Sequence, residues 1–256
     1  MSKSLVQQQF GANAAAYATS VVHAQGASLK RVVELVQPQP HWRALDVATA
    51  AGHTAFAVAP HVAHVLATDL TPEMIPVAQG VAAEKGIGNV SFENADAEAL
   101  PYAEGTFDLV TCRIAPHHFE HIDRFLAGCY RMLRPGGTLV VVDNVVPGGV
   151  QAEAGQYIND FEKLRDPSHY RCLSLDEWEA AFAAAGFSVT HTEIAAKRMV
   201  FLPWAERMGA SAETIARLRA MLIDSPADAA AFFRTEPEGD DDIAFHLDEA
   251  IVIGRR

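Results

Sequence analysis

Cysteine is scarce in this 256-residue chain, and the few cysteines are not paired along the sequence. Cys112, Cys129 and Cys172 are odd in number, widely spaced and include no CxxC pair. This usage argues against a disulfide framework or a cysteine-based metal site, and it is typical of reduced, buried thiols in the cytoplasm. The sequence therefore predicts structural thiols in a cytoplasmic protein.

Long apolar runs and basic clusters are also missing. No apolar run approaches the roughly 18 residues that a membrane span needs, and residues 1–20 lack the charged-then-apolar layout of a secretory signal. The formal net charge of −12 argues against nucleic acid or an anionic membrane as the main partner, because both select for clustered Lys and Arg. We therefore expect a small-molecule partner, no nucleic acid, no membrane span, and either a monomer or a homodimer.

Glycine is sparse where a nucleotide loop would need it. The stretch ALDVATAAGHTA (Ala44–Ala55) has the frame of a strand, a tight turn and a helix, but only Gly52 stands where a dinucleotide loop would read GxGxxG. Asp46 would also bring a negative charge close to a pyrophosphate. Asp69, a second acid, follows at about the spacing used to hold a ribose diol. The loop thus disfavours a pyrophosphate, and with it a nicotinamide-dependent oxidoreductase, and a carboxylate at the end of the strand suits a cationic ligand instead.

The middle of the chain alternates between strand-like and helix-like segments. This alternation predicts parallel βαβ units in a doubly wound α/β fold. Between the strands, Thr71 and Pro72 predict a helix start, and Pro135 with Gly136 predicts the stop of a helix that begins at His121. The expected strands are 43–49, 62–70, 89–96, 106–115 and 138–146, with 188–195 and 250–256 completing a mostly parallel sheet of seven strands.

The two ends of the chain differ from this centre. Residues 4–36 read as helical, 147–173 interrupt the alternation, and 236–242 read as a solvated loop. Ser174 and Glu177 form the spacing of a capping box before another helix. We expect one domain over 1–256, with 1–38 as a helical lid and 147–173 as an insertion that covers a substrate.

Four stretches of the chain together carry a family resemblance. LDVATAAGHTA, ATDLTPEM, ENADAEALPYAEGTFDLVTCRIAPHHF and RMLRPGGTLVVVD follow one another in order and at matching intervals. They resemble the motifs of class I S-adenosylmethionine (SAM)-dependent methyltransferases, and most closely those of the branch that contains the ubiquinone and menaquinone biosynthesis methyltransferases. The resemblance runs from about 43 to 147 and is weaker up to the final strand.

The resemblance implies a set of SAM-binding residues and a product, S-adenosylhomocysteine. Asp46 and the backbone of Ala48 would hold the methionine amino end, and Gly52 would allow close approach. Asp69 would accept both ribose hydroxyls. The remaining roles would be packing on the adenine by Leu70 and Met74, contacts to the adenine edge by Asp96 and the Ala97 amide, and proximity to the methionine portion by Arg113.

Ala50 departs from the family pattern, which has glycine at this position. Its methyl group costs room or strain wherever φ must be positive, so SAM affinity or the shape of the loop is open. This departure keeps an alternative function open, in which the chain binds SAM without transferring methyl, as a cyclase-like enzyme or a regulatory module. The activity that the resemblance implies is methyl transfer to a small or medium organic acceptor. The methylated atom of that acceptor could be oxygen, carbon, nitrogen or sulfur.

Histidines provide the candidates for acid–base chemistry. His117 and His118 follow the fourth strand, and imidazole suits general-base work near neutral pH; a structural role in a helical turn is the competing interpretation. Their spacing to His121 would suit zinc, but no Cys or carboxylate cluster completes a site, so we predict no metal. The candidates for contact with the acceptor are Phe10, Tyr17, Asn144, Arg165 and His169.

Overall fold

The computed structural model describes residues 3–18 and 26–256, with the side chains of all of these except 12–18. Across this part of the chain, eight strands form one sheet in the order β3-β2-β1-β4-β5-β8-β6, with β7 paired to β8. The parallel strands are β1 (Arg43–Val47), β2 (His64–Asp69), β3 (Val90–Asn94), β4 (Phe107–Arg113) and β5 (Leu133–Val145). The antiparallel strands are β6 (Ser188–Val200), β7 (Glu236–Glu238) and β8 (Asp242–Arg255).

This topology confirms the predicted doubly wound, mostly parallel sheet. The first five strands overlap the five predicted segments, although β5 begins earlier than expected. β1, β2 and β4 are buried along nearly their whole length, as parallel strands covered on both faces must be. The sheet has one strand more than the seven predicted. The additional strand, β7, has three residues and lies within the stretch that was expected to be a solvated loop. β6 and β8 run well beyond the segments predicted for them.

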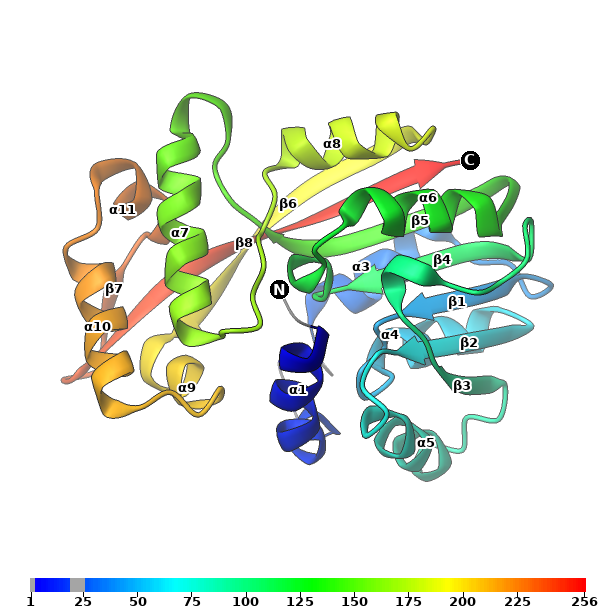
Figure 1. Ribbon diagram of the computed structural model, residues 1–256, viewed down its shortest axis with the longest axis horizontal. Helices are drawn as coiled ribbons and strands as arrows, with labels where there is room; N and C mark the ends of the chain where they lie inside the picture. The colour runs from blue at the N-terminus through cyan, green and yellow to red at the C-terminus, as the bar shows by residue number, and fades with distance from the viewer. Residues whose placement is uncertain (1–2, 19–25) are drawn as a thin grey trace.

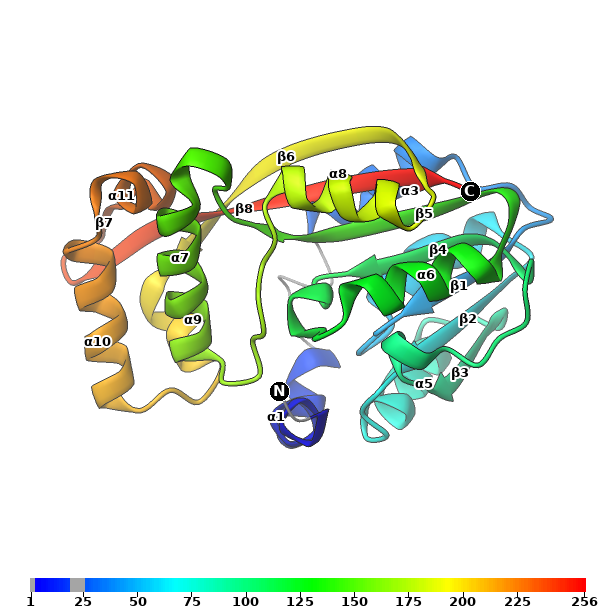
Figure 2. The same cartoon turned by 45° about the horizontal axis from the view of Figure 1, so that its top comes forward.

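Helices cover both faces of the sheet (Figures 1 and 2). On one face, α6 (Ile122–Met132) and α8 (Leu175–Ala184) bury Phe125, Trp178 and Phe182 against the strands. On the other face lie α3 (Ala27–Val36), α4 (His53–Val58) and the η1 turn (Ala59–His61), with α5 (Met74–Glu84). The predicted capping box is confirmed, because Ser174 Oγ accepts from the amide of Glu177 and the Glu177 carboxylate accepts from the amide of Ser174.

Two predicted helix boundaries were wrong. The helix expected to begin at Thr71 begins at Met74. Residues 71–73 form a turn in which the carbonyls of Thr71 and Pro72 accept from the amides of Met74 and Ile75, and Pro76 has no N–H to donate back to Pro72 and start the helical pattern earlier. The helix expected to stop at Pro135 ends at Met132, and β5 begins at once at Leu133 with an irregular register opposite β4.

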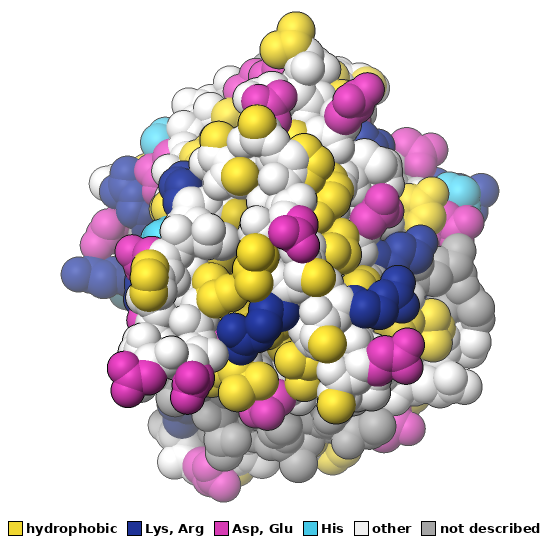
Figure 3. Space-filling view, turned by 90° about the vertical axis from the view of Figure 1, so that its left-hand side faces the viewer, with side chains coloured by type: hydrophobic (Ala, Val, Ile, Leu, Met, Phe, Trp, Pro, Cys, Tyr) yellow, Lys and Arg dark blue, Asp and Glu magenta, His cyan; other side chains and the backbone are white. Residues whose placement is uncertain are grey.

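A helical lobe lies beside the sheet, where β6 and β8 extend past the end of β5 (Figure 1). It contains the η4 turn (Gly149–Gln151), α7 (Ala152–Arg165), α9 (Phe201–Glu206), α10 (Ala212–Ile223) and α11 (Ala227–Phe233). Its core is aromatic, with Phe161 stacked on Trp204 at 5.0 Å between ring centroids and Phe233 and Phe245 around them. The outer end of the lobe carries apolar side chains between basic and acidic groups (Figure 3). The lobe places α7 opposite the carboxyl ends of the strands.

The N-terminal helix α1 (Lys3–Ala18) lies beside α5, near the carboxyl ends of the parallel strands (Figures 1 and 2). Gln7 donates from Nε2 to the carbonyl of Leu70, the residue that follows β2, at 3.0 Å. Within the described residues, no helix is both long and apolar enough to cross a membrane.

Candidate functional site

A cavity opens at the carboxyl ends of β1, β2, β4 and β5 and extends towards α7 and α9. In an open parallel sheet this edge is where ligands bind. One part, which we call the β2 half, is lined by the loops after β1, β2 and β3. The other part, which we call the α7 half, is lined by the turn after β4, the end of β5, α7, α9 and the facing parts of β6 and β8.

The loop after β1 has a left-handed backbone at alternate residues. The φ angles are 55° at Ala48, 46° at Ala50 and 90° at Gly52. A left-handed backbone costs a residue with a side chain about 1 kcal/mol relative to glycine. The methyl group of Ala50 therefore does bring strain, as the departure from glycine suggested, and Ala48 brings as much. Both alanines nevertheless line the β2 half.

Asp46 holds this loop from behind. Its Oδ2 accepts from Thr49 Oγ1 at 2.6 Å and from the amide of Ala55 at 3.2 Å, and its Oδ1 accepts from Thr111 Oγ1 at 2.7 Å. Burial raises the pKa of Asp46 to about 6 despite these donors and the nearby Arg113. Neither Asp46 nor Gly52 lines the cavity. The side chain expected at the methionine end of SAM is thus engaged in fixing the turn.

Asp69 stands at the carboxyl end of β2 and lines the cavity. Its Oδ2 accepts from the amide of Ala50 at 2.8 Å, and its Oδ1 accepts from the amide of Thr71 at 2.9 Å. Burial raises the pKa of this carboxyl above its usual value of 3.8, against the effect of both amides. Each carboxylate oxygen has room for a further donor, so the two hydroxyls of a diol could bind side by side.

Asp96 follows β3 and begins the η2 turn (Ala97–Ala99), with its Oδ1 accepting from the amide of Glu98 at 3.0 Å. Lys3 from α1 forms ion pairs with both Asp96 and Glu98. Leu70, Met74 and Ala97 line the same β2 half, and Arg113, at the end of β4, lines the cavity where the two halves meet. Sequence reasoning missed Lys3, His53 and Glu98 as lining residues; a lone lysine in a polar helix gave no signal.

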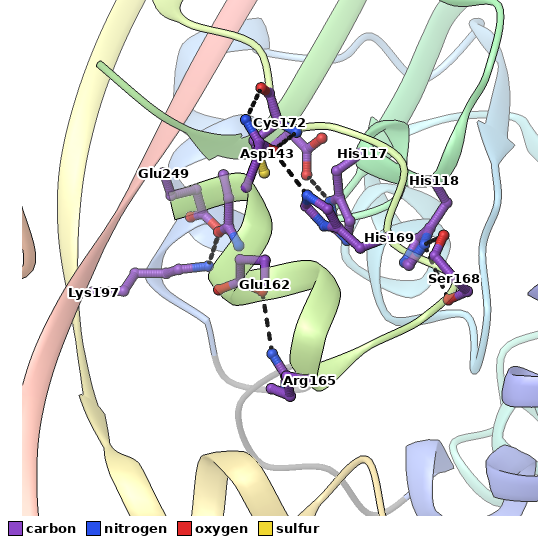
Figure 4. A network of polar contacts seen from close by, with 12 residues as sticks. His117, His118, Asp143, Glu162, Arg165, Ser168, His169, Cys172, Lys197 and Glu249 are labelled. Carbon is purple, nitrogen blue, oxygen red and sulfur yellow. Dashed lines mark hydrogen bonds and ion pairs between the residues drawn. The ribbon is translucent and has the colours of Figure 1, made fainter. Parts of the chain in front are cut away.

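Three histidines meet at the boundary of the two halves, near the η3 turn (Pro116–His118) and the loop after α7 (Figure 4). Nδ1 of His117 lies 2.6 Å from Oδ1 of Asp143. The His118 ring lies 4.2 Å and the His169 ring 5.4 Å from the His117 ring, between centroids. His118 is hydrogen-bonded through Nδ1 to the carbonyl of Ser168 at 2.9 Å, and His169 through Nε2 to Asn159 Oδ1 at 2.9 Å.

The three imidazoles differ in their affinity for a proton. Burial lowers the pKa of His117, but the carboxylates of Asp143, Glu162 and Asp166 raise it by more, so it lies above 6.5. Burial and the neighbouring His117 lower the pKa of His118 to about 4. Burial and both neighbouring rings lower that of His169. A single proton on this cluster is therefore held by His117.

The far wall of the α7 half is polar and ion-paired (Figure 4). Arg165 Nη1 lies 3.3 Å from Glu162 Oε2, and its guanidinium lies 4.2 Å from the centre of the Trp204 ring. Lys197 donates to Asn144 Oδ1 at 2.8 Å and to Glu249 Oε2 at 3.1 Å. Sequence reasoning found Asn144 and Arg165 but missed Glu162, Lys197 and Trp204, which come from three separate elements.

Nearly all predicted site residues come together in this cavity. Among the acceptor candidates, Phe10, Asn144, Arg165 and His169 line it, and Phe10 meets the His118 ring edge-on at 5.0 Å. The side chain of Tyr17 lies outside the described residues. Among the side chains that are described, no three His, Cys, Asp or Glu groups are arranged to hold a metal ion.

This topology and this strand-end cavity define a Rossmann-like methyltransferase fold. A family model described as a methyltransferase domain matches residues 45–141. An uncharacterized methyltransferase of Bacillus subtilis, YcgJ, is 38% identical over 175 residues, which are 68% of each chain. The chain belongs to the methyltransferase family.

Solved structures agree with this assignment. The YcgJ crystal structure superposes with a TM-score of 0.84 at 31% identity and covers 90% of this chain and 97% of its own. A putative methyltransferase of Bacillus halodurans gives a TM-score of 0.85 at 31% identity, with 90% and 99% covered. The ubiquinone/menaquinone biosynthesis C-methyltransferase UbiE of Brucella canis is 37% identical over 109 residues, 41% of this chain and 40% of that protein. The predicted family resemblance is confirmed. It favours methyl transfer over the alternative in which the chain binds SAM without transferring methyl.

Proposed function

We propose that the protein transfers a methyl group from SAM to a small or medium organic acceptor, releasing S-adenosylhomocysteine. The observation that carries the proposal is the pair of carboxylates at the ends of neighbouring strands. Asp69 and Asp96 both line the β2 half, and Asp69 is fixed by two backbone amides. This is a preorganised acceptor for a ribose diol, with a second carboxylate within the same half for the adenine edge.

The residues of the β2 half suit the rest of the cofactor. Leu70 and Met74 supply an apolar surface for the adenine, and the Ala97 amide supplies a donor for its ring. The backbone at Ala48 and the guanidinium of Arg113 are available to the methionine portion. When bound, SAM supplies a methyl group on a positively charged sulfur, which is already a good electrophile. In this proposal Asp46 acts on the cofactor indirectly, by holding Thr49 and the start of α4 in place.

The α7 half is the proposed acceptor site, with residues 147–173 and 1–38 as its covers. Phe10, Asn144, Arg165 and His169 would contact the acceptor there. Holding two reactants in line accounts for much of the barrier reduction in a transfer of this kind, and the shared cavity would do so. Three free, buried cysteines support the accompanying expectation of a cytoplasmic protein.

The test is calorimetric titration with SAM, S-adenosylhomocysteine and NAD. We expect micromolar binding of the two adenosyl ligands and none of NAD, and a product analysis should find S-adenosylhomocysteine in step with a methylated acceptor. Binding of NAD alone would refute the proposal. Binding of SAM without any methylated product across a broad acceptor panel would favour the non-transferring alternative.

A further inference from the structure

The pair of His117 and Asp143 comes from the ends of two neighbouring parallel strands. His117 lies in the turn that follows β4, and Asp143 lies near the end of β5, with Nδ1 and Oδ1 2.6 Å apart. The carbonyl of His117 accepts from the amides of Tyr170 and Arg171, at 2.8 and 3.0 Å, which ties the turn to the loop after α7. Both the ring and its backbone are therefore fixed.

This contact decides which ring nitrogen faces the ligand. A carboxylate only accepts hydrogen bonds, so Nδ1 of His117 carries a proton and donates it to Asp143. In the neutral imidazole, Nε2 then holds the lone pair. The His117 side chain is 11% exposed and lines the cavity, whereas the Asp143 side chain is 1% exposed. Asp143 thus orients the base from behind, as a carboxylate orients histidine in many acid–base pairs.

Resting on the proposed function, we propose that His117, held by Asp143, takes the proton from a hydroxyl acceptor of the phenol or enol class as that oxygen is methylated. The O–H bond of the acceptor breaks and its proton goes to Nε2 of His117. An O–C bond forms to the methyl group, and the S–C bond breaks with its electron pair going to sulfur. The positive charge of the sulfonium is then carried by the protonated imidazole, so charge and atoms balance.

The chemistry of the base favours a hydroxyl over an amine. Cations and carboxylates both line the α7 half, and Arg165 and Lys197 are paired with Glu162 and Glu249, so the net charge of the wall does not select the acceptor. A neutral amine attacks with a lone pair that it already has and loses its proton only after the transfer. A phenol or enol is too weak an acid to ionise fully by itself near neutral pH, so its methylation needs a base such as His117.

His118 is not the base in this proposal. Its Nδ1 is bound to a backbone carbonyl, with no carboxylate directly behind it, and protonated His117 opposes a second charge 4.2 Å away between ring centroids. The charged and titratable groups that act on His117 come from η3, β5, α7 and the loop after it: Asp143, Glu162, Asp166, His118 and His169.

The first experiment needs no acceptor. Imidazole titration by NMR, on the protein with S-adenosylhomocysteine bound, should show His117 titrating above 6.5 and moving to lower pH in Asp143→Asn. His61→Gln, an exposed control, should leave that titration unchanged and allows its own signal to be assigned. A His117 titration at or below 6.5, or one that Asp143→Asn does not move, would overturn the role of Asp143 as a positioning residue.

The second experiment measures S-adenosylhomocysteine formation with matched probes: phenol and catechol, benzylamine, and thiophenol. We expect turnover with the phenols, a loss of about 10²-fold or more in kcat for His117→Gln, and at least a tenfold loss for Asp143→Asn. KM and S-adenosylhomocysteine affinity should change less than threefold, and the acid limb of the pH profile should shift down in Asp143→Asn.

Turnover with the amine or thiol but not with the phenols, or phenol turnover that survives His117→Gln, would overturn the proposal. So would cofactor binding without methylation of either phenol. Failure of the cofactor to bind is a separate result, because it would refute the proposed function while the NMR titration of the unliganded protein still tests the pair.

Discussion

Asp46 is expected to make the stability of the protein fall as pH rises through the weakly acidic range. Its pKa lies at about 6 in the folded protein, against a usual 3.8, because burial outweighs its hydrogen bonds. Between these two values the folded state binds more protons at this site than the unfolded state. Its contribution to stability is therefore present at low pH and lost as pH rises through 6. The full effect is about 3 kcal/mol, of which about 2 kcal/mol falls between pH 4.5 and 7.

Asp46→Asn isolates this contribution. Asparagine can accept from Thr49 Oγ1 and the amide of Ala55 through its oxygen, and its Nδ2 can donate to Thr111 Oγ1, so the contacts survive without the charge. The free energy of unfolding of the variant relative to the natural protein should rise by about 2 kcal/mol from pH 4.5 to pH 7. Urea denaturation across that range, without ligand, measures it.

Taking the difference between the two proteins removes the titration of the other carboxyl groups. An exposed control, Asp240→Asn, should give a difference that stays flat with pH. A flat difference for Asp46→Asn as well, or one of opposite sign, would refute the reasoning that burial dominates over the three hydrogen bonds at this carboxyl.

Three further predictions concern the same edge of the sheet. Gly52→Ala should destabilise the protein by about 2 kcal/mol or more, because a Cβ there would lie 2.3 Å from the Phe56 ring at a φ of +90°. Gly80→Ala, in open space within α5, should instead stabilise the protein slightly. Chemical denaturation compares the two variants. Ala50→Val should cost about 2 kcal/mol, since a β-branched residue is poorly tolerated at positive φ, and an unchanged melting temperature would contradict the assigned backbone. Asp69→Asn should weaken S-adenosylhomocysteine binding at least tenfold in calorimetry, because a diol would lose a charged acceptor; equal affinity would remove Asp69 from the proposed site.

The central fold could be predicted because its signals are local. β1, β2 and β4 are buried apolar runs between turns, β3 was marked by its alternation, and the capping box at Ser174 is complete within four residues. The helical lobe could not be predicted this way. α9 and α11 have six and seven residues, too short to form without support, and they are stabilised by packing around Phe161 and Phe245.

The candidate site also has one part that local sequence signals predict and one part that they do not. The β2 half is made of contiguous motifs, so most of its lining residues were found from sequence, apart from Lys3, His53 and Glu98. The sequence also could not show that Asp46 turns away from the cavity. The α7 half depends on pairs that are distant in sequence. His117 and Asp143 are 26 residues apart and meet only because β4 and β5 are neighbours, and Lys197 reaches Asn144 from 53 residues away.

The loop with two alanines keeps its left-handed turns because the acids around it hold its backbone in place by hydrogen bonds. Left-handed backbone at Ala48 and Ala50 costs about 2 kcal/mol together. Against this, Asp69 accepts from the amide of Ala50, and Asp46 accepts from Thr49 and from the amide of Ala55. Burial raises the pKa of both acids, so these hydrogen bonds do not make the charged carboxylates favourable overall and do not cancel the strain. They fix the position of the backbone, and the loop therefore depends on the two carboxylates for its shape before any ligand arrives.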